Sequence, residues 1–306
     1  MSVGSGKKSI VNDLDVSDVN IDDVDLFRVD VSDSDVFSDE DEEAQEVSTI
    51  KEVGNLVKKK AVVLDPALEE YVFKVIKKLS QLKAVQIDRE RFLRTELAKF
   101  CPPEQVEEAV KTSPSQAGVD ETVIEKIKDG AISLETKMVS GLSFAAGIPG
   151  GLALGVTVPL DTANYIAYSL RIEQKLAYLY GWESFFDDED EVSDDTIYQF
   201  ILFLGVMMGV GGAAVALKQF ALTTARQGVV KAVQKQALTK TTFYPVLKKI
   251  VRVLGVKMTK PIFAKGVGKI VPVVGGVISG GMTYATFKPG AHRLAKHLAT
   301  LPQAKA

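Results

Sequence analysis

Three long runs without a charged side chain set the strongest limit on how this 306-residue chain can fold. They cover residues 138–160, 196–217 and 270–287, which makes them 23, 22 and 18 residues long. A helix needs about 20 apolar residues to cross a bilayer, so each run reaches or approaches that length. The first run contains five Gly and two Pro, and the last contains four Gly and one Pro, so neither has the composition of a strongly apolar span. The middle run, rich in Phe, Leu and Met, is the best candidate for a true span, and an apolar buried core is the alternative.

Each run also contains two glycines four residues apart, a spacing that places both on one face of a helix. The pairs are Gly151 with Gly155, Gly205 with Gly209, and Gly276 with Gly280. Small residues at this spacing let a neighbouring helix approach backbone to backbone. The sequence therefore predicts closely packed helices, either in a lipid-embedded hairpin or in an unusually apolar core.

The sequence outside these runs also follows a helical pattern. After Pro66, apolar residues recur three and four positions apart, and the aspartate before this proline is a suitable N-cap. Further helices are predicted from near Asp88 to before Cys101, around residues 106–110, and from Asp120 onward. No alternation of polar and apolar residues predicts a strand. We therefore expect an all-α fold, with a multi-helical single domain over residues 61–306.

Charge is distributed very unevenly along the chain. Residues 1–50 carry 15 acidic and 3 basic side chains, whereas residues 196–306 carry 16 basic side chains and no acidic one. The N-terminal stretch interleaves Asp, Glu and Ser with isolated apolar residues, which cannot offset the entropy of ordering. We expect residues 1–60 to form a disordered acidic tail. It acts either as a solubilising segment or as an electrostatic cover over the basic C-terminal third.

The most specific polar signal lies directly after the first uncharged run. At helical spacing, five residues form a polar stripe on an otherwise apolar helix: Asp161, Asn164, Tyr165, Tyr168 and Arg171. A carboxylate beside so much apolar surface is costly unless it is paired or hydrated, so a partner such as a cation from another helix is expected. The stripe is either a polar network that packs helices together or a ligand or ion site.

Several motifs in this part of the chain resemble the EcsC protein family. They are Gly150-Gly151 in the first run, Pro159-Leu160-Asp161, the segment 168–182 that ends in Tyr180-Gly181-Trp182, and the glycine clusters of 271–281. The resemblance covers roughly residues 65–300. It implies a bacterial, membrane-linked helical protein, and it implies no known reaction.

Motifs typical of enzymes are weak or incomplete. Residues 209–214 imitate a dinucleotide fingerprint, but that motif needs a preceding strand and an acid about 20 residues later, and no acid follows Asp195. His292 and His297 have no carboxylate near them in the sequence, and Cys101 has no local base. A single cysteine also excludes an intrachain disulfide and favours a reducing compartment. We therefore expect a protein that is not an enzyme and that holds no metal or cofactor.

The basic C-terminal third suggests a partner. Its cations alternate with apolar residues at helix-like spacing, which suits an anionic lipid surface, where each nearby Lys or Arg contributes about 1 kcal/mol. The candidates for membrane contact are Lys218, Arg226, Lys231, Lys235, Lys248, Lys249, Arg252, Lys257 and Lys260. Few aromatic residues and very few arginines accompany them, which argues against specific nucleic-acid binding. A solvated basic face without a dedicated partner is the simpler alternative.

These patterns predict a noncatalytic accessory or regulator of a membrane process, and the resemblance to the EcsC family implies that this process is transport. We expect it at the cytoplasmic face of the cell membrane, with a transporter or another protein as a possible partner. Two alternatives stay open at this point. One is a membrane-inserting or pore-forming effector, and the other is a carrier that holds an apolar, lipid-like ligand among the glycine-rich helices around Asp161.

Overall fold

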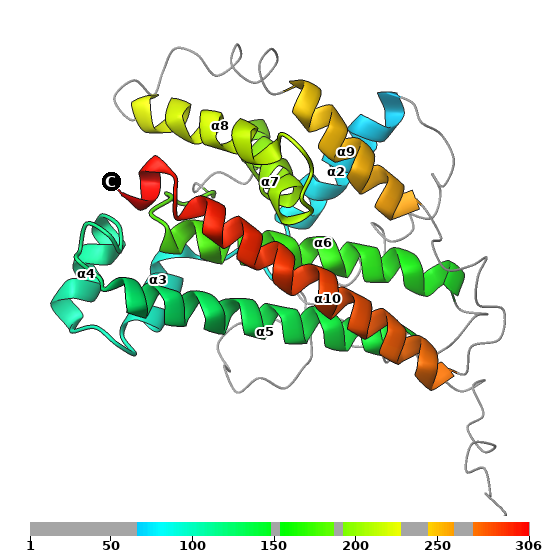
Figure 1. Ribbon diagram of the computed structural model, residues 1–306, viewed down its shortest axis with the longest axis horizontal. Coiled ribbons are helices and arrows are strands. Elements are labelled where there is room, and N and C mark those ends of the chain that lie inside the picture. Colours follow the sequence, from blue (N-terminus) through cyan, green and yellow to red (C-terminus); the bar gives the residue numbers. More distant parts are fainter. Residues whose placement is uncertain (1–65, 148–153, 187–191, 228–243, 260–271, 306) are drawn as a thin grey trace, which may run out of the picture.

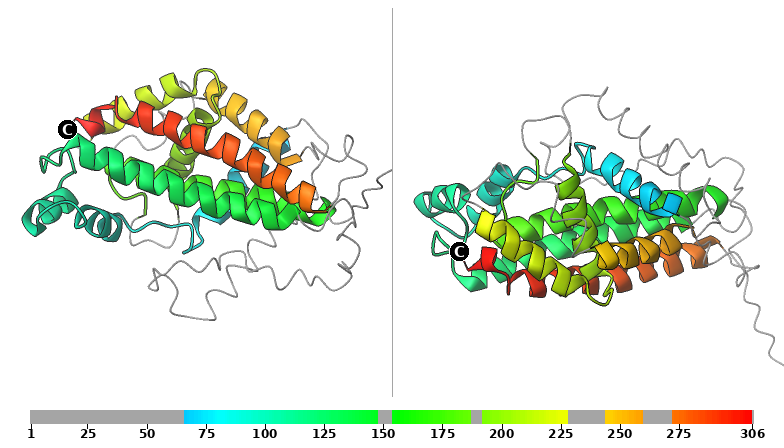
Figure 2. Two further views of the ribbon diagram at one scale, coloured as in Figure 1. Left: turned by 60° about the horizontal axis from the view of Figure 1, so that its bottom comes forward. Right: turned by 90° about the horizontal axis from the view of Figure 1, so that it is seen from above.

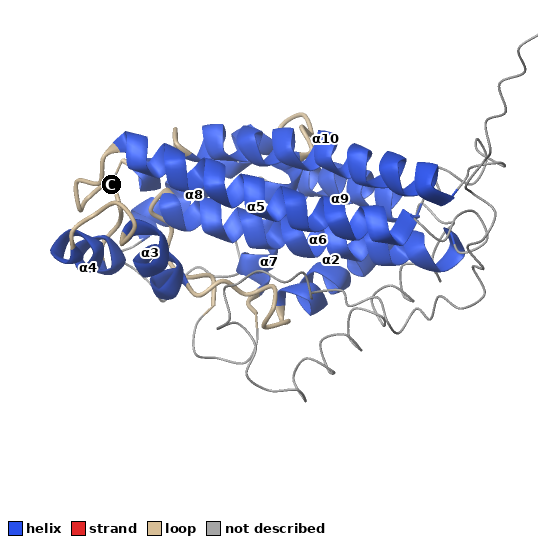
Figure 3. Cartoon of the chain, turned by 90° about the horizontal axis from the view of Figure 1, so that it is seen from below, coloured by secondary structure: helices blue, strands red, loops and turns tan. Residues whose placement is uncertain are grey.

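The computed structural model describes residues 66–147, 154–186, 192–227, 244–259 and 272–305 (Figure 1). These residues form helices and loops without a strand (Figure 3), so the all-α prediction is confirmed. The predicted acidic tail, residues 1–60, lies outside the described residues together with its boundary. The elements are α2 (Pro66–Ser80), α3 (Arg89–Leu97), α4 (Pro103–Lys111), α5 (Glu121–Gly147), α6 (Leu154–Leu179), α7 (Asp194–Met207), α8 (Ala213–Gln227), α9 (Tyr244–Thr259), α10 (Pro272–Leu298) and a 3-10 turn η3 (Pro302–Ala304).

Local sequence chemistry explains where several helices begin. Pro66 is the first residue of α2, where a missing backbone N–H costs nothing. The carboxylate of Asp88 accepts a hydrogen bond from the backbone N–H of Arg91 and caps α3. Ser193 caps α7 in the same way, with Thr196 as donor, and two aspartates in the first turn of that helix complement its dipole.

Three long helices, α5, α6 and α10, run side by side along the long axis of the molecule (Figure 2). On α10, Thr283 donates a hydrogen bond to Ser143 of α5 at 2.9 Å, and His292 lies 4.0 Å from Asp129 of the same helix. Because residue numbers rise on one helix as they fall on the other, α10 is antiparallel to α5. Helix α10 also packs against α6, where Phe287 meets Tyr165 edge to face.

The remaining helices pack around this central group. Helices α2, α7, α8 and α9 lie together on one side of it, whereas α3 and α4 lie near the start of α5 (Figure 1). Ten of the fourteen residues of α7 are buried, so this helix is apolar because it crosses the protein core.

The middle uncharged run is not one continuous helix, so its reading as a single membrane span is wrong. Helix α7 ends at Met207, and α8 starts at Ala213 after a turn in which Gly209 has φ 69° and Gly212 has φ 94°. Glycine adopts this left-handed backbone at little cost, and other residues rarely do. Gly205 and Gly209 therefore do not share a helix face. Among the described helices, none combines the length and the apolar character that crossing a membrane requires.

Candidate functional site

The predicted polar stripe of α6 divides between two neighbouring helices. Tyr165 packs against Phe287 of α10 with ring centroids 5.7 Å apart, and burial raises the pKa of its phenol above the ordinary value. Arg171 instead faces α5, and its guanidinium lies 5.9 Å from the ring of Tyr168. Asn164 is buried, and its side-chain oxygen has no hydrogen-bond partner among the described residues. The backbone of Asp161 belongs to α6, but its side chain lies outside the described part of the chain.

Arg171 belongs to a buried charge cluster that we call the Glu135 cluster: Glu135, Arg171 and Lys175. The carboxylate of Glu135 is 1% exposed and accepts from Lys175 Nζ at 2.6 Å and from two nitrogens of Arg171 at 3.2 and 3.3 Å. Burial alone would raise the pKa of Glu135, but the two cations outweigh it and hold the pKa below its ordinary value. The cluster contains one anion and two cations, so it carries a formal excess of one positive charge.

Two α6 side chains also form hydrogen bonds with the loop between α2 and α3. Arg171 donates to the carbonyl of Ala84. The amide of Gln174 donates to the carbonyl of Val85 at 2.9 Å, and its oxygen accepts from the backbone N–H of Ile87 at 2.8 Å. These bonds satisfy backbone groups that a loop crossing a helix would otherwise leave unpaired. The cluster and its neighbour Gln174 thus hold three segments of the chain together.

The Tyr-Gly-Trp segment at the end of α6 is also architectural. Gly181 has φ 80°, and a Cβ atom there would lie 2.3 Å from the carbonyl oxygen of Gln303 in the C-terminal turn. Trp182 is buried, and its ring meets Phe203 edge to face at 5.2 Å. Arg89 donates to the carbonyl of Trp182 and to two carbonyls at the end of α4. The motifs that resemble a known family therefore fix the fold at these positions.

Glu173 is a second buried acid, and its environment is opposite to that of Glu135. It is fully buried, and neither carboxylate oxygen has a hydrogen-bond partner in the described part of the protein. Burial raises its pKa well above the ordinary value, which favours the neutral, protonated form. A neutral carboxyl costs much less to bury than a carboxylate.

In the part of the chain that the structure describes, the residues that most often carry catalysis or bind metals are not assembled into a site. Cys101 lies beside the core, and burial raises the pKa of its thiol, which keeps the sulfur in its less reactive form. Burial lowers the pKa of His297, and His292 lies near the single carboxylate of Asp129. Within the described ranges, no three His, Cys, Asp or Glu side chains gather where they could hold a metal ion.

A basic surface surrounds the turn between α7 and α8. Its exposed cations are Lys218 of α8, Lys249 and Arg252 of α9, and Arg293 and Lys296 of α10. Two contacts bring these helices together at the turn. Lys249 Nζ donates to the carbonyl of Gly211 at 3.2 Å, and Arg293 donates to the carbonyl of Met207.

Exposed glycines and one exposed apolar side chain lie beside these cations. The three glycines of the turn are exposed, and Val215, in the first turn of α8, is 63% exposed. Helices α8, α9 and α10 contain no acidic residue, and the carboxylate of Asp129 on α5 approaches them at His292. Cations around a small apolar projection are the arrangement that suits the interface of an anionic bilayer.

The predicted membrane-contact residues are only partly described. Lys218, Lys248, Lys249 and Arg252 are exposed on α8 and α9. Arg226 and Lys257 belong to these helices, but their side chains lie outside the described part. Lys231, Lys235 and Lys260 lie outside it as whole residues. Arg293 and Lys296 were absent from the predicted set, although the lack of any acid after Asp195 extends the same signal to them.

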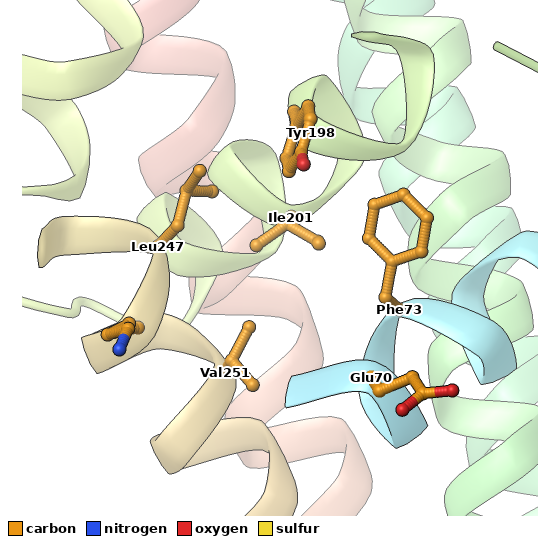
Figure 4. A pocket seen from close by; sticks show the side chains of 7 residues that line it. Glu70, Phe73, Tyr198, Ile201, Leu247 and Val251 are labelled. Carbon is orange, nitrogen blue, oxygen red and sulfur yellow. The ribbon is translucent and has the colours of Figure 1, made fainter. Parts of the chain in front are cut away.

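A small pocket lies between α2, α7 and α9, away from the α6 stripe where an apolar ligand was expected. Its volume is about 200 Å³, and Figure 4 shows Phe73, Tyr198, Ile201, Leu247 and Val251 around it. The rings of Phe73 and Tyr198 pack with centroids 5.5 Å apart. Glu70 and Lys248, both exposed, complete the lining, so the pocket combines apolar walls with charges at its edge.

The predicted packing glycines have different roles. A Cβ atom on Gly205 would lie 2.4 Å from Cδ1 of Ile250 and 3.1 Å from Ala213, so α7 meets both α8 and α9 closely there. Gly290 was not among the predicted packing glycines. A Cβ atom on Gly290 would lie 2.9 Å from the carbonyl oxygen of Met207, so glycine allows α10 to approach this carbonyl closely. Gly155, Gly276 and Gly280 belong to α6 and α10, and Gly151 lies outside the described residues.

No protein-family model, curated protein or solved structure matches this chain. The resemblance to the EcsC family stays a prediction, and the function has to be argued from the residues themselves.

Proposed function

We propose that this protein is a noncatalytic accessory or regulator of a membrane process, and that it docks on an anionic bilayer through its basic surface. The observation that carries the proposal is the set of five exposed cations around the turn of residues 208–212, on three helices that contain no acid. Each cation near an anionic surface contributes about 1 kcal/mol, so five of them are enough for stable but salt-sensitive attachment.

The exposed turn strengthens this reading. Val215, which is 63% exposed, can reach the head-group region, and the side chains of Arg293 and Lys249 lie against Gly209 and Gly211 beside it. Apolar contact then adds to the electrostatic attraction. The Glu135 cluster supports the function indirectly, by holding α5 and α6, on which α10 packs, in a fixed arrangement.

Co-sedimentation with vesicles of phosphatidylcholine and phosphatidylglycerol tests this proposal. We expect binding at low ionic strength that high salt reverses, and weak binding to phosphatidylcholine alone. The double variant Lys249→Glu with Lys296→Glu should bind at least tenfold more weakly, since it removes two attractive charges and adds two repulsive ones. The matched control is Lys99→Glu with Lys126→Glu, which makes the same charge change outside the basic surface. Full-length protein that stays in the supernatant at low salt would refute the proposal.

The pocket favours a second candidate function, the binding of a small apolar ligand. Its walls come from three helices, and its volume of about 200 Å³ suits the end of an acyl chain or one aromatic group. Fluorescence of 1-anilinonaphthalene-8-sulfonate on titration with the native protein would detect such binding. The variant Ile201→Phe, which adds volume to the pocket wall, should abolish the signal. An unchanged signal in this variant would place the dye elsewhere and remove the support for a carrier.

A further inference from the structure

The basic surface has no acidic partner among the described residues. Its exposed cations are Lys218, Lys249, Arg252, Arg293 and Lys296. None of the five forms an ion pair with a carboxylate in the described part of the chain. The segments that join α8 to α9 and α9 to α10, residues 228–243 and 260–271, contain no Asp or Glu either. No side chain after Asp195 can therefore neutralise this surface.

The N-terminal part of the sequence carries the matching charge. Residues 33–46, which we call the acidic block, contain eight acidic side chains and no basic one. Five of these acids are consecutive, in residues 39–43. Opposite charges of this density attract one another strongly at low ionic strength. The acidic block is therefore a candidate occupant of the basic surface.

A second acidic run, residues 187–191, is held away from the turn between α7 and α8. It lies between Phe186 and Val192, and α7 starts directly afterwards at Asp194. The turn lies beyond the other end of α7, which rises about 20 Å to Met207. Five residues that are anchored at both ends can project only about 10 Å. This run therefore cannot occupy the turn.

The acidic block, in contrast, enters the fold beside the basic surface. It joins α2 through residues 47–65, and α2 lies against α9 (Figure 1). Phe73 of α2 and Val251 of α9 line the same pocket (Figure 4). In sequence, Val251 lies between Lys249 and Arg252, so both cations are within about one helical turn of the place where α2 meets α9.

The length of the connection is sufficient for the acidic block to reach this surface. Residues 47–65 number 19, and a flexible chain of this length has a root-mean-square end-to-end distance of about 24 Å. Its fully extended length is about 65 Å. Tethering of this kind gives an effective concentration in the millimolar range, which favours the block of the same chain over that of a second copy.

We propose that the acidic block binds the basic surface of the same molecule and competes there with an anionic membrane for the five cations. Eight negative charges exceed five positive ones, so a covered surface repels an anionic bilayer. The competition rests on the proposed docking, whereas the contact between the block and the surface needs no membrane. The N-terminal region would thus regulate when the protein attaches.

Carbodiimide cross-linking tests the contact without lipid, because EDC joins a carboxylate to an amine only when the two touch. The full-length protein is treated at low micromolar concentration and low ionic strength. Mass spectrometry should find intramolecular cross-links from residues 33–46 to Lys218, Lys249 and Lys296. The control lysines, Lys111 of α4 and Lys126 of α5, are also exposed and should not be joined to the acidic block.

The double variant Lys249→Glu with Lys296→Glu should lower the yield of cross-links to Lys218 several-fold, since it removes attraction without removing this amine. Lys99→Glu with Lys126→Glu should leave the yield unchanged. Cross-links from the block to Lys58, Lys59 and Lys60 in place of the surface would overturn the proposal. Cross-linked dimers would also overturn it, because the occupant would then be a second copy.

Vesicle binding tests the competition. The full-length test variant carries Asp39→Asn, Glu40→Gln, Asp41→Asn, Glu42→Gln and Glu43→Gln. The matched control carries Asp187→Asn, Asp188→Asn, Glu189→Gln, Asp190→Asn and Glu191→Gln. Both remove five negative charges, but only the test variant weakens the competitor. We expect the test variant to bind vesicles of phosphatidylcholine and phosphatidylglycerol about threefold more tightly than the native protein, and the control to gain much less. Equal gains would indicate general repulsion and overturn the competition.

The contact and the docking fail in different ways. If the cross-links form but neither the native protein nor the test variant sediments with anionic vesicles at low salt, the contact stands and the docking is refuted, together with the competition. If both proteins sediment equally well and no cross-links to the basic surface form, the docking stands and the contact is overturned.

Discussion

Lys175 places its ammonium nitrogen 2.6 Å from the carboxylate of Glu135, which is 1% exposed and also contacts Arg171. Removing this carboxylate leaves two cations facing each other without compensation. We expect Glu135→Gln to lower the free energy of unfolding by about 3–5 kcal/mol, measured by urea denaturation at neutral pH. Glu107→Gln, which breaks an exposed pair with Arg94, should change stability little. Equal effects of the two variants would contradict the role of the Glu135 cluster.

The same carboxylate makes stability depend on pH at the acidic side. The two cations hold the pKa of Glu135 in the folded protein below its ordinary value, despite burial. Its contribution is therefore complete above the unfolded pKa, near 4.5, and is lost as the pH falls through the folded pKa. Unfolding curves of the native protein and Glu135→Gln should converge as the pH is lowered from 6 toward this range. Parallel curves would show that the carboxylate is not the titrating group.

Glu173 should produce the opposite dependence. Burial raises its pKa well above 4.5, so the unfolded chain releases this proton at a lower pH than the folded protein does. The neutral carboxyl contributes full relative stability below the unfolded pKa, and this is lost as the pH rises through the folded pKa. Glu173→Gln keeps the shape without the titration, so the melting temperature of this variant should rise relative to that of the native protein as the pH increases above 4.5. A constant difference across this range would contradict the assignment.

Alanine substitutions of Gly118 and Gly181 distinguish the cost of a left-handed backbone from the cost of a steric clash. A Cβ at Gly181 would lie 2.3 Å from Gln303 O, whereas a Cβ at Gly118, with φ 67°, meets nothing within 4 Å. Gly118→Ala should therefore cost about 1–2 kcal/mol for conformation alone. Gly181→Ala should cost clearly more, because the C-terminal turn must also move. Equal losses of unfolding free energy in chemical denaturation would show that the C-terminal turn can move at little cost.

Gly205 and Ile250 should be energetically coupled. Gly205→Ala brings a methyl group to 2.4 Å from Cδ1 of Ile250, and overpacking of this kind costs about 1–3 kcal/mol. Ile250→Val removes that Cδ1 atom and alone costs about 0.5–1.5 kcal/mol. The double variant should be more stable than the sum of the two losses predicts, as a double-mutant cycle can measure. Strict additivity would argue against the contact.

Val215 tests the apolar part of the proposed docking surface. Because 63% of its surface is exposed, Val215→Asp should fold normally. The new charge repels an anionic bilayer and removes an apolar contact, so vesicle binding should weaken several-fold. Val215→Leu keeps the apolar character and should bind at least as well as the native protein. If Val215→Asp binds with unchanged affinity, the turn does not face the membrane.

The starts of the helices could be predicted because the signals for them are local. Pro66, Asp88 and the acidic first turn at Glu121 act within a few residues of themselves, and the helices begin at or beside them. The partner of Arg171 could not be predicted in this way. Glu135 is 36 residues away on a different helix, and only the packing of α5 against α6 brings the two together.

The spacing of glycines in the sequence did not predict the structural role of each glycine. Gly205 packs inside a helix, but Gly209, four residues later, lies in a turn with φ 69°. The same spacing is compatible with either role, because a missing Cβ permits both close approach and a left-handed backbone. The uncharged run of residues 196–217 was therefore a poor guide to helix length. Its separation into α7 and α8 also created the exposed turn that the basic surface surrounds.

The position of α10 in the chain has a consequence for biosynthesis. Helix α5 packs along α10, but α10 starts only at Pro272, long after α5 has left the ribosome. Until then, the α5 face that buries Ser143, and the α6 residues that receive Phe287, have no cover. Such delayed pairing leaves apolar surface exposed during translation. We therefore expect this surface of the nascent protein to stay exposed until its last helix has been made.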